Sequence, residues 1–166
     1  NDDRLLRLYN ALIDAILRTN AFAPAAEEAL GLKIDSAMLP ILPKPVPWRE
    51  IFVYSRRVEG IHLRAGAVAR GGIRWSDRRD DFRTEVLVLL KAQRVKNAVI
   101  VPTGAKGGFY PKQLPDPGRD REGWAAEGQA AYEVFIRTLL SITDNIVDDE
   151  VVHPRDVVIH DGKDPY

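Results

Sequence analysis

The stretch VIVPTGAKGGFYPK, residues 99–112, places one lysine among glycines directly after an apolar run. Residues 98–102 have the length and the β-branched side chains of a buried strand that ends at Pro102. The glycines that follow predict a loop at the carboxyl end of that strand, where ligands of α/β proteins bind. A lysine enclosed in a pocket there is a candidate acid or base, whereas a lysine in an open turn has no such role. The stretch alone leaves both readings of Lys106 open.

The glycine loop does not match a phosphate-binding loop. A Walker motif needs four residues between its first glycine and a Gly-Lys pair, followed by serine or threonine. Here Ala105 precedes Lys106, and Gly107 stands at the hydroxyl position. The dinucleotide fingerprint G-x-G-x-x-G does not occur in the sequence either. We therefore expect no nucleotide site within these 166 residues.

Strands and helices are predicted to alternate on both sides of this stretch. The assignments rest on apolar spacing, β-branched runs and glycine turns. The predicted elements are a helix over 2–19, a strand over 51–54, a hairpin of 58–64 with 67–70 turned at Ala65 and Gly66, helices within 76–98 and 121–143, and a strand over 156–160. This alternation predicts an α/β fold with a mixed, mainly parallel sheet flanked by helices, and an N-terminal helical segment.

Four prolines within residues 40–47 divide the chain. Proline fits neither a helix interior nor a central strand, so this stretch is predicted to be a stiff connector. We expect residues 1–47 to form a helical segment with this connector, and residues 48–166 to form the main domain. The chain starts inside a helical pattern without methionine and stops without a terminating element, so we expect a piece of a larger protein.

Composition excludes several functional classes. The absence of cysteine rules out disulfides, thiol catalysis and cysteine-based zinc sites. Basic and acidic residues number 24 each, so no overall field attracts nucleic acid or an anionic membrane. His62, His153 and His160 lie far apart without metal-binding spacing, and we expect all three to be structural.

Two further stretches carry groups that suit a carboxylate ligand. Arg70 precedes a pair of glycines, and an arginine can bind a carboxylate through two hydrogen bonds while Gly71 and Gly72 allow close approach to the backbone. Gln93 and Lys96 lie three residues apart on one face of a predicted helix. The charges between these stretches are expected to face solvent or to pair with one another: Arg78, Arg79 and Arg83 with Asp77, Asp80 and Asp81.

Together these stretches resemble the substrate-binding domain of the glutamate, leucine, phenylalanine and valine dehydrogenase superfamily. The resemblance is strongest over residues 49–112, and there it is to the large NAD-dependent glutamate dehydrogenases of bacteria. It implies that residues 48–166 are an incomplete substrate-binding catalytic domain. It also implies that NAD is bound by a dinucleotide-binding domain outside this chain.

The resemblance assigns a role to the first stretch, RGGIR. This stretch corresponds to KGGLR of the superfamily, so Arg70 stands where a substrate-binding lysine usually lies. Gly71 and Gly72 match the glycines of that motif. A positive group for the substrate side-chain carboxylate is kept, although arginine differs from lysine in reach and in its forked geometry.

The resemblance also assigns roles to the other two stretches. Gln93 and Lys96 correspond to the glutamine and lysine that bind the substrate α-carboxylate. TGAKGG corresponds to GGAKGG, with Thr103 in place of a glycine, and this makes Lys106 the catalytic lysine.

The implied reaction is the NAD-dependent oxidative deamination of L-glutamate to 2-oxoglutarate and ammonia. Lys106 would help a water molecule attack the iminium carbon that remains after hydride transfer. The proton-transferring aspartate is expected beyond Tyr166, because Asp161 and Asp164 do not match its motif. The resemblance further implies a cytoplasmic homo-oligomer with no membrane or nucleic-acid partner, and this 166-residue piece alone is expected to be inactive.

Two other readings stay open. One is a non-catalytic carboxylate-binding or regulatory module that kept the pocket. The other is an assembly domain, which would show an exposed apolar patch. Retention of Lys106 beside Gln93 and Lys96 favours the enzyme, because a degenerate pocket has no need of the lysine.

Overall fold

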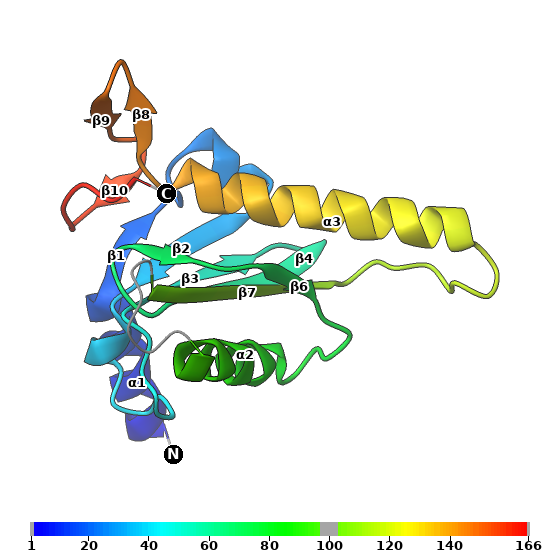
Figure 1. The fold of residues 1–166 in the computed structure, drawn as a ribbon, viewed down its shortest axis with the longest axis horizontal. Coiled ribbons are helices and arrows are strands. Elements are labelled where there is room, and N and C mark those ends of the chain that lie inside the picture. The colour runs from blue at the N-terminus through cyan, green and yellow to red at the C-terminus, as the bar shows by residue number, and fades with distance from the viewer. Residues whose placement is uncertain (1, 97–102, 166) are drawn as a thin grey trace.

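An eight-stranded sheet lies between two long helices in the computed structural model, which describes residues 2–96 and 103–165 (Figure 1). The side chains of residues 94–96 lie outside this description. Helix α2 (Phe82–Lys96) covers one face of the sheet and helix α3 (Arg121–Ser141) covers the other. The sheet strands are β1 (Ile16–Thr19), β2 (Leu30–Ile34), β3 (Arg49–Tyr54), β4 (Val58–Arg64), β5 (Ala69–Arg70), β6 (Ile73–Trp75), β7 (Thr103–Pro111) and β10 (Val158–Ile159).

The remaining elements lie around this sandwich. Helix α1 (Asp2–Ala15) opens the chain, and two short 3₁₀ helices follow, η1 (Pro24–Glu27) and η2 (Ser36–Met38). Strands β8 (Asn145–Val147) and β9 (Glu150–Val152) form a separate hairpin that projects from the sheet (Figure 1). No helix in the described parts of the chain is long and apolar enough to cross a membrane.

The α/β class and the flanking helices are confirmed, but the sheet is mainly antiparallel rather than mainly parallel. Its order is β10-β1-β2-β3-β4-β7-β5, with β6 also paired to β7. All pairings from β10 to β7 are antiparallel, and parallel pairing occurs where β5 and β6 meet β7. The direction of neighbouring strands depends on the length of the connection between them. A short turn can join only antiparallel neighbours, whereas a parallel pair needs a long crossover. Helix α2 provides one between β6 and β7, whereas three residues join β3 to β4.

The predicted hairpin of β4 with β5 is wrong. Strand β7 lies between them, antiparallel to β4 on one side and parallel to β5 on the other. Even the predicted turn is bonded to β7, because the amide of Ala65 donates to the carbonyl oxygen of Gly104 at 2.9 Å. A partner distant in sequence therefore replaces the local one.

The predicted glycine loop is itself the strand β7, whereas residues 98–102, predicted to be a strand, lie outside the described residues. Its glycines make room for neighbours. A Cβ on Gly107 would lie 2.4 Å from Cδ1 of Ile73, and one on Gly108 would lie 2.4 Å from Cγ2 of Val86. Both separations are far below van der Waals contact, so glycine lets β6 and α2 pack directly against β7.

The predicted N-terminal helix ends four residues early, at Ala15, and residues 16–19 form β1. Pairing with β2 and β10 overrides the helical spacing there. Both β1 and β2 precede Pro47, so the sheet includes strands from the first segment. The domain boundary at residue 47 stays a prediction. Helices α2 and α3 are confirmed.

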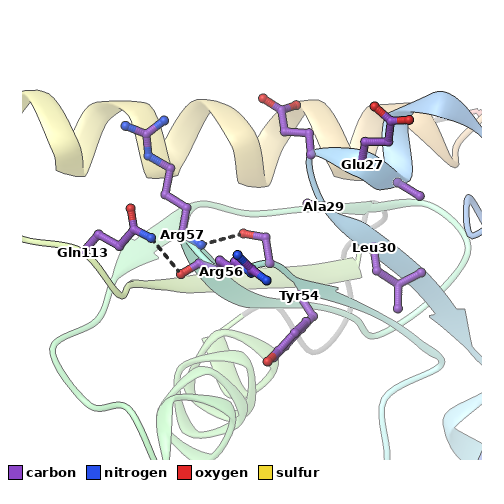
Figure 2. Close-up of a pocket in the computed structure, with 10 residues that line it drawn as sticks. Glu27, Ala29, Leu30, Tyr54, Arg56, Arg57 and Gln113 are labelled. Carbon is purple, nitrogen blue, oxygen red and sulfur yellow. Dashed lines mark hydrogen bonds between the residues drawn. The ribbon is translucent and has the colours of Figure 1, made fainter.

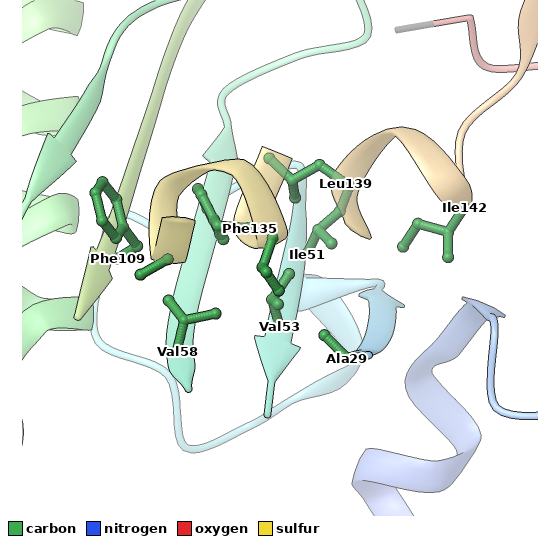
Figure 3. Packing of buried hydrophobic residues seen from close by; sticks show 10 residues of the cluster. Ala29, Ile51, Val53, Val58, Phe109, Phe135, Leu139 and Ile142 are labelled. Atoms are coloured by element: carbon green, nitrogen blue, oxygen red, sulfur yellow. The ribbon is translucent and has the colours of Figure 1, made fainter. Parts of the chain in front are cut away.

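Two apolar layers hold the sandwich together. On the α3 side, Phe135 and Leu139 pack over Ile51, Val53 and Val58 of β3 and β4 (Figure 3). On the α2 side, the buried cluster comprises Ile61, Leu63, Phe82, Val86, Leu87 and Leu90. Each buried side chain of this size contributes roughly 1.5–3 kcal/mol, so burial fixes both helices on the sheet that carries β7.

Candidate functional site

All six predicted site residues have described backbones, and they lie where β5, β7 and the end of α2 adjoin. Arg70 pairs with Gly104 in the parallel register of β5 and β7. Gln93, on α2, donates a hydrogen bond from Nε2 to the carbonyl oxygen of Arg70 at 2.9 Å. Lys96 closes the same helix, but its side chain lies outside the described residues.

Gly71 and Gly72 bring the edge strand against the backbone of β7. A Cβ on Gly71 would lie 1.4 Å from the carbonyl oxygen of Ala105, so no other residue fits there unless the backbone moves. The carbonyl oxygen of Gly72 accepts a hydrogen bond from the amide of Gly107 at 3.1 Å. The glycine pair therefore lets the segment after Arg70 lie directly beside β7.

Lys106 lies in the middle of this arrangement. It is half-buried on β7, opposite Leu63 of β4. Its Nζ would be 3.9 Å from a Cβ built on Gly72, so the amine reaches the edge formed by the glycine pair. Arg70 is exposed at the same edge. A cationic group on a strand and a second one beside it suit a ligand that carries carboxylates.

The amide of Gln93 is only partly satisfied. Its Oε1 is buried and has no hydrogen-bond partner among the described residues. The space over Gly104 is filled by this side chain, since a Cβ there would lie 3.0 Å from Oε1. The other amide atom, Nε2, holds the backbone of Arg70 through the hydrogen bond described above. The position of Gln93 in the sequence did not suggest this role.

A cavity of about 480 Å³ adjoins Gly71, and its walls include His62, Arg64, Ala105 and Asp164. The His62 imidazole is buried, and burial, with the neighbouring Arg64 charge, lowers its pKa to about 4. Near neutral pH it therefore lines the cavity as an uncharged group that can donate one hydrogen bond and accept another.

Comparison with known proteins identifies the family. The family described as bacterial NAD-glutamate dehydrogenase, catalytic domain, matches residues 1–166. The chain belongs to this family. NAD-specific glutamate dehydrogenases of Halomonas elongata, Pseudomonas aeruginosa and Mycobacterium tuberculosis are 60%, 58% and 54% identical to it, over 100%, 100% and 99% of its length.

The chain is one part of such an enzyme. It spans only about a tenth of the length of these relatives, namely 10%, 10% and 11%. What the whole protein does is therefore a matter for proposal.

A buried network of charges joins the sheet to the segment after α3, and the sequence analysis did not predict it. Arg18 pairs with Asp144 at 2.7 Å and with Asp161 at 2.5 Å. Burial disfavours the Arg18 charge, but these hydrogen bonds outweigh it and raise the pKa of Arg18 above its usual value. Burial would likewise raise the pKa of Asp144, yet the bonds from Arg18, the Asp164 amide and His153 hold it well below its usual range.

Few sequence signals pointed to this network. Lys33, which pairs with Asp161 and Asp164 at 2.5 Å each, stands between apolar residues of β2, and that was the one available sign. His153 was expected to be structural, and its Nδ1 lies 2.7 Å from Asp144. Among the described residues no group of three or more histidine or acidic side chains is placed to hold a metal ion.

The surface charges follow the prediction in part. Arg78 pairs with Asp81, as expected. Arg83 instead pairs with Glu50 of β3, through hydrogen bonds of 3.0 and 3.2 Å. This pair fixes the start of α2 to the sheet.

A second cavity, of about 370 Å³, lies at the turn between β3 and β4 (Figure 2). Its wall includes Arg56, whose carbonyl oxygen accepts from Nε2 of Gln113 at 3.4 Å, and Arg57, whose amide donates to Oγ of Ser55 at 3.1 Å. It carries none of the predicted site residues. Lys106 pairs with the opposite end of β4, so the two regions are separate.

Proposed function

We propose that the full protein containing this chain catalyses the NAD-dependent oxidative deamination of L-glutamate to 2-oxoglutarate and ammonia. The observation that carries the proposal is the convergence of Arg70, Gly72, Gln93 and Lys106 at one edge of β7. These residues come from three separate stretches of the sequence. Their meeting is what a shared binding site requires.

In this proposal each side chain has a chemical task. Lys106 faces the reacting carbon and orients the attacking water. Arg70, from the exposed edge, binds the substrate side-chain carboxylate, and Gly71 and Gly72 allow the substrate to approach the backbone. Gln93 and Lys96 act on the α-carboxylate, with Gln93 also holding the backbone of Arg70.

We propose that NAD is bound by a part of the protein outside this chain. The space beside the glycines of β7 is occupied by four side chains, those of Ile73, His62, Val86 and Gln93. No room is left beside these glycines for a pyrophosphate. When bound, NAD supplies the hydride acceptor. The residues of this chain bind and orient the amino acid and hold a water molecule.

The assembly reading is supported by one observation. Leu6, Tyr9 and Ile13 of α1 are 64%, 57% and 63% exposed, which is an apolar surface of the kind that contacts another chain. We therefore propose that the full-length enzyme is a homo-oligomer. Its cytoplasmic location is a separate proposal, which rests on the family resemblance. The piece of 166 residues is expected to have no activity by itself.

The test of the proposed function is a steady-state assay of the purified full-length protein. Reduction of NAD that depends on L-glutamate, with 2-oxoglutarate and ammonia formed in equal amounts, is the expected result. L-Aspartate, which is shorter by one methylene, is the matched control substrate. A protein that reduces NAD with neither, under conditions where it is folded, would refute the proposal.

A further inference from the structure

Three buried cations of the sheet meet three carboxylates of the segment that follows α3. Arg18, Lys33 and Arg64 lie on β1, β2 and β4 and are each at most 4% exposed. Their partners are Asp144, Asp161 and Asp164. Apart from β10, the segment of residues 144–164 forms no strand pairing with the main sheet in the described residues. The charge network holds the segment there together with β10 and the packing of Val157 against the apolar cluster on the α3 side.

A buried charge network of this kind adds little to the free energy of folding, but it favours one arrangement of the paired segments over others. Removing ions from water is costly, and buried pairs often do no better than apolar packing would. Here the charges balance, three against three, and each carboxylate meets at least one cation at 2.7 Å or less. A shifted segment would leave buried charges unpaired, so one position of residues 144–164 is strongly preferred.

Arg64 connects this network to the candidate site. Its Nη1 donates to Asp164 at 2.6 Å and its Nη2 donates to the same carboxylate at 3.1 Å. Nη2 also donates to the carbonyl oxygen of Ala67, in the stretch that leads to Arg70. Arg64 pairs with Ala105 across β4 and β7, one residue from Lys106. One guanidinium thus touches both the segment after α3 and the edge that carries the predicted substrate-binding residues.

The two segments bonded to Arg64 both line one cavity. Asp164 and Pro165 form one wall, and Ala67, Val68, Ala69 and Gly71 form another. Asp164 therefore contributes to the wall of the same space that Gly71 lines.

We propose that Arg64 and Asp164 are positioning residues whose ion pair couples the segment 144–165 to the edge segment 67–72 and so sets the geometry of the substrate site. The part of this inference that concerns substrate rests on the proposed function. The coupling of the two segments does not, because it can be measured without any reaction.

The test uses the full-length enzyme with Asp164→Asn, which keeps the size of the side chain and removes its charge. Asp164→Glu keeps the charge and serves as the conservative rescue if the first variant folds poorly. Asp14→Asn, an exposed carboxylate on α1, is the matched control. Hydrogen exchange is followed by mass spectrometry in peptides covering 65–72 and 144–165, and the KM for glutamate is measured beside it.

In Asp164→Asn we expect protection to fall about tenfold in both peptides, not in 144–165 alone. We expect the KM for glutamate to rise about fivefold, as for the loss of a hydrogen-bonded constraint, with Asp164→Glu intermediate and Asp14→Asn unchanged.

Three results would overturn the proposal. Unchanged exchange in 144–165 would show that the pair does not hold that segment. Loss of protection confined to 144–165 would reduce the pair to a local structural role. Loss in both peptides with an unchanged KM would remove the link to the substrate site. If the unmodified enzyme does not oxidise glutamate, the proposed function fails, and the exchange in 65–72 still decides the coupling.

Discussion

Gln93 donates a hydrogen bond from Nε2 to the carbonyl oxygen of Arg70 at 2.9 Å, joining the last turn of α2 to the edge strand β5. This contact orders the backbone that presents the Arg70 guanidinium. It spans 23 residues of sequence, so it links two of the stretches that the family resemblance singled out.

Substitution of Gln93 by Met tests this contact, because it keeps the approximate side-chain size and removes the donor without adding a charge. We expect the KM for glutamate to rise about fivefold, corresponding to about 1 kcal/mol for one lost hydrogen bond. The exposed Thr84→Ala on the same helix serves as control. An unchanged KM with a lowered unfolding temperature would assign Gln93 a purely structural role.

Replacement of Gly71 by alanine tests the close approach of the edge strand to β7. The added methyl group would lie 1.4 Å from the carbonyl oxygen of Ala105, so the strand has to move. We expect a loss of stability of about 1–3 kcal/mol, the usual cost of overpacking, together with a raised KM for glutamate. Gly162→Ala is the matched control, because nothing lies within 4 Å of its added Cβ. Equal unfolding temperatures for the two variants would contradict the packing described here.

Removal of a buried cation tests the charge network. Arg18→Met leaves Asp144 buried without its main partner, and we expect a destabilisation of about 3–5 kcal/mol. Arg137→Met breaks an exposed pair with Glu28 and should change stability far less. Chemical denaturation of the two variants beside the unmodified protein measures the difference. Similar losses would show that burial adds nothing to the Arg18 pair.

The pH dependence of stability tests the state of His62. Its pKa is about 4 in the folded protein, against the ordinary value of 6.5. Between these pH values the unfolded chain binds the proton and the folded protein does not, so stability falls as pH drops from 6.5 to 4. The difference of 2.5 pKa units corresponds to about 3 kcal/mol in total.

Two variants isolate the contribution of His62 to this pH dependence. His62→Gln should lose this part of the slope, whereas His160→Gln, at an exposed position, should keep it. Unfolding free energies measured at intervals across this range give the slopes. A slope that persists in His62→Gln would assign it to other groups.

The sequence predicted the helices better than the sheet. Helices α2 and α3 follow from apolar spacing, which tertiary contacts reinforce. The order and direction of the strands depend on partners distant in sequence. Strand β7 separates β4 from β5, and no local signal in residues 58–70 indicates this.

Glycine explains the remaining error at the site. Glycine permits unusual backbone angles, and Gly104, Gly107 and Gly108 therefore predict a loop. Here they lie in an extended strand and serve to admit Gln93, Ile73 and Val86. Likewise, Asp164 could not be recognised as a buried partner of Arg64, because the pair spans 100 residues.

Lys106 is the proposed catalytic lysine, and replacing it tests the proposed function most directly. In the full-length enzyme, the kcat of glutamate oxidation should fall at least about a hundredfold in Lys106→Ala, the usual contribution of a positioned acid or base, with NAD affinity nearly unchanged. Lys91→Ala, an exposed lysine on α2, should keep the kcat of the unmodified enzyme. A Lys106→Ala enzyme that is folded and retains its kcat would contradict the account.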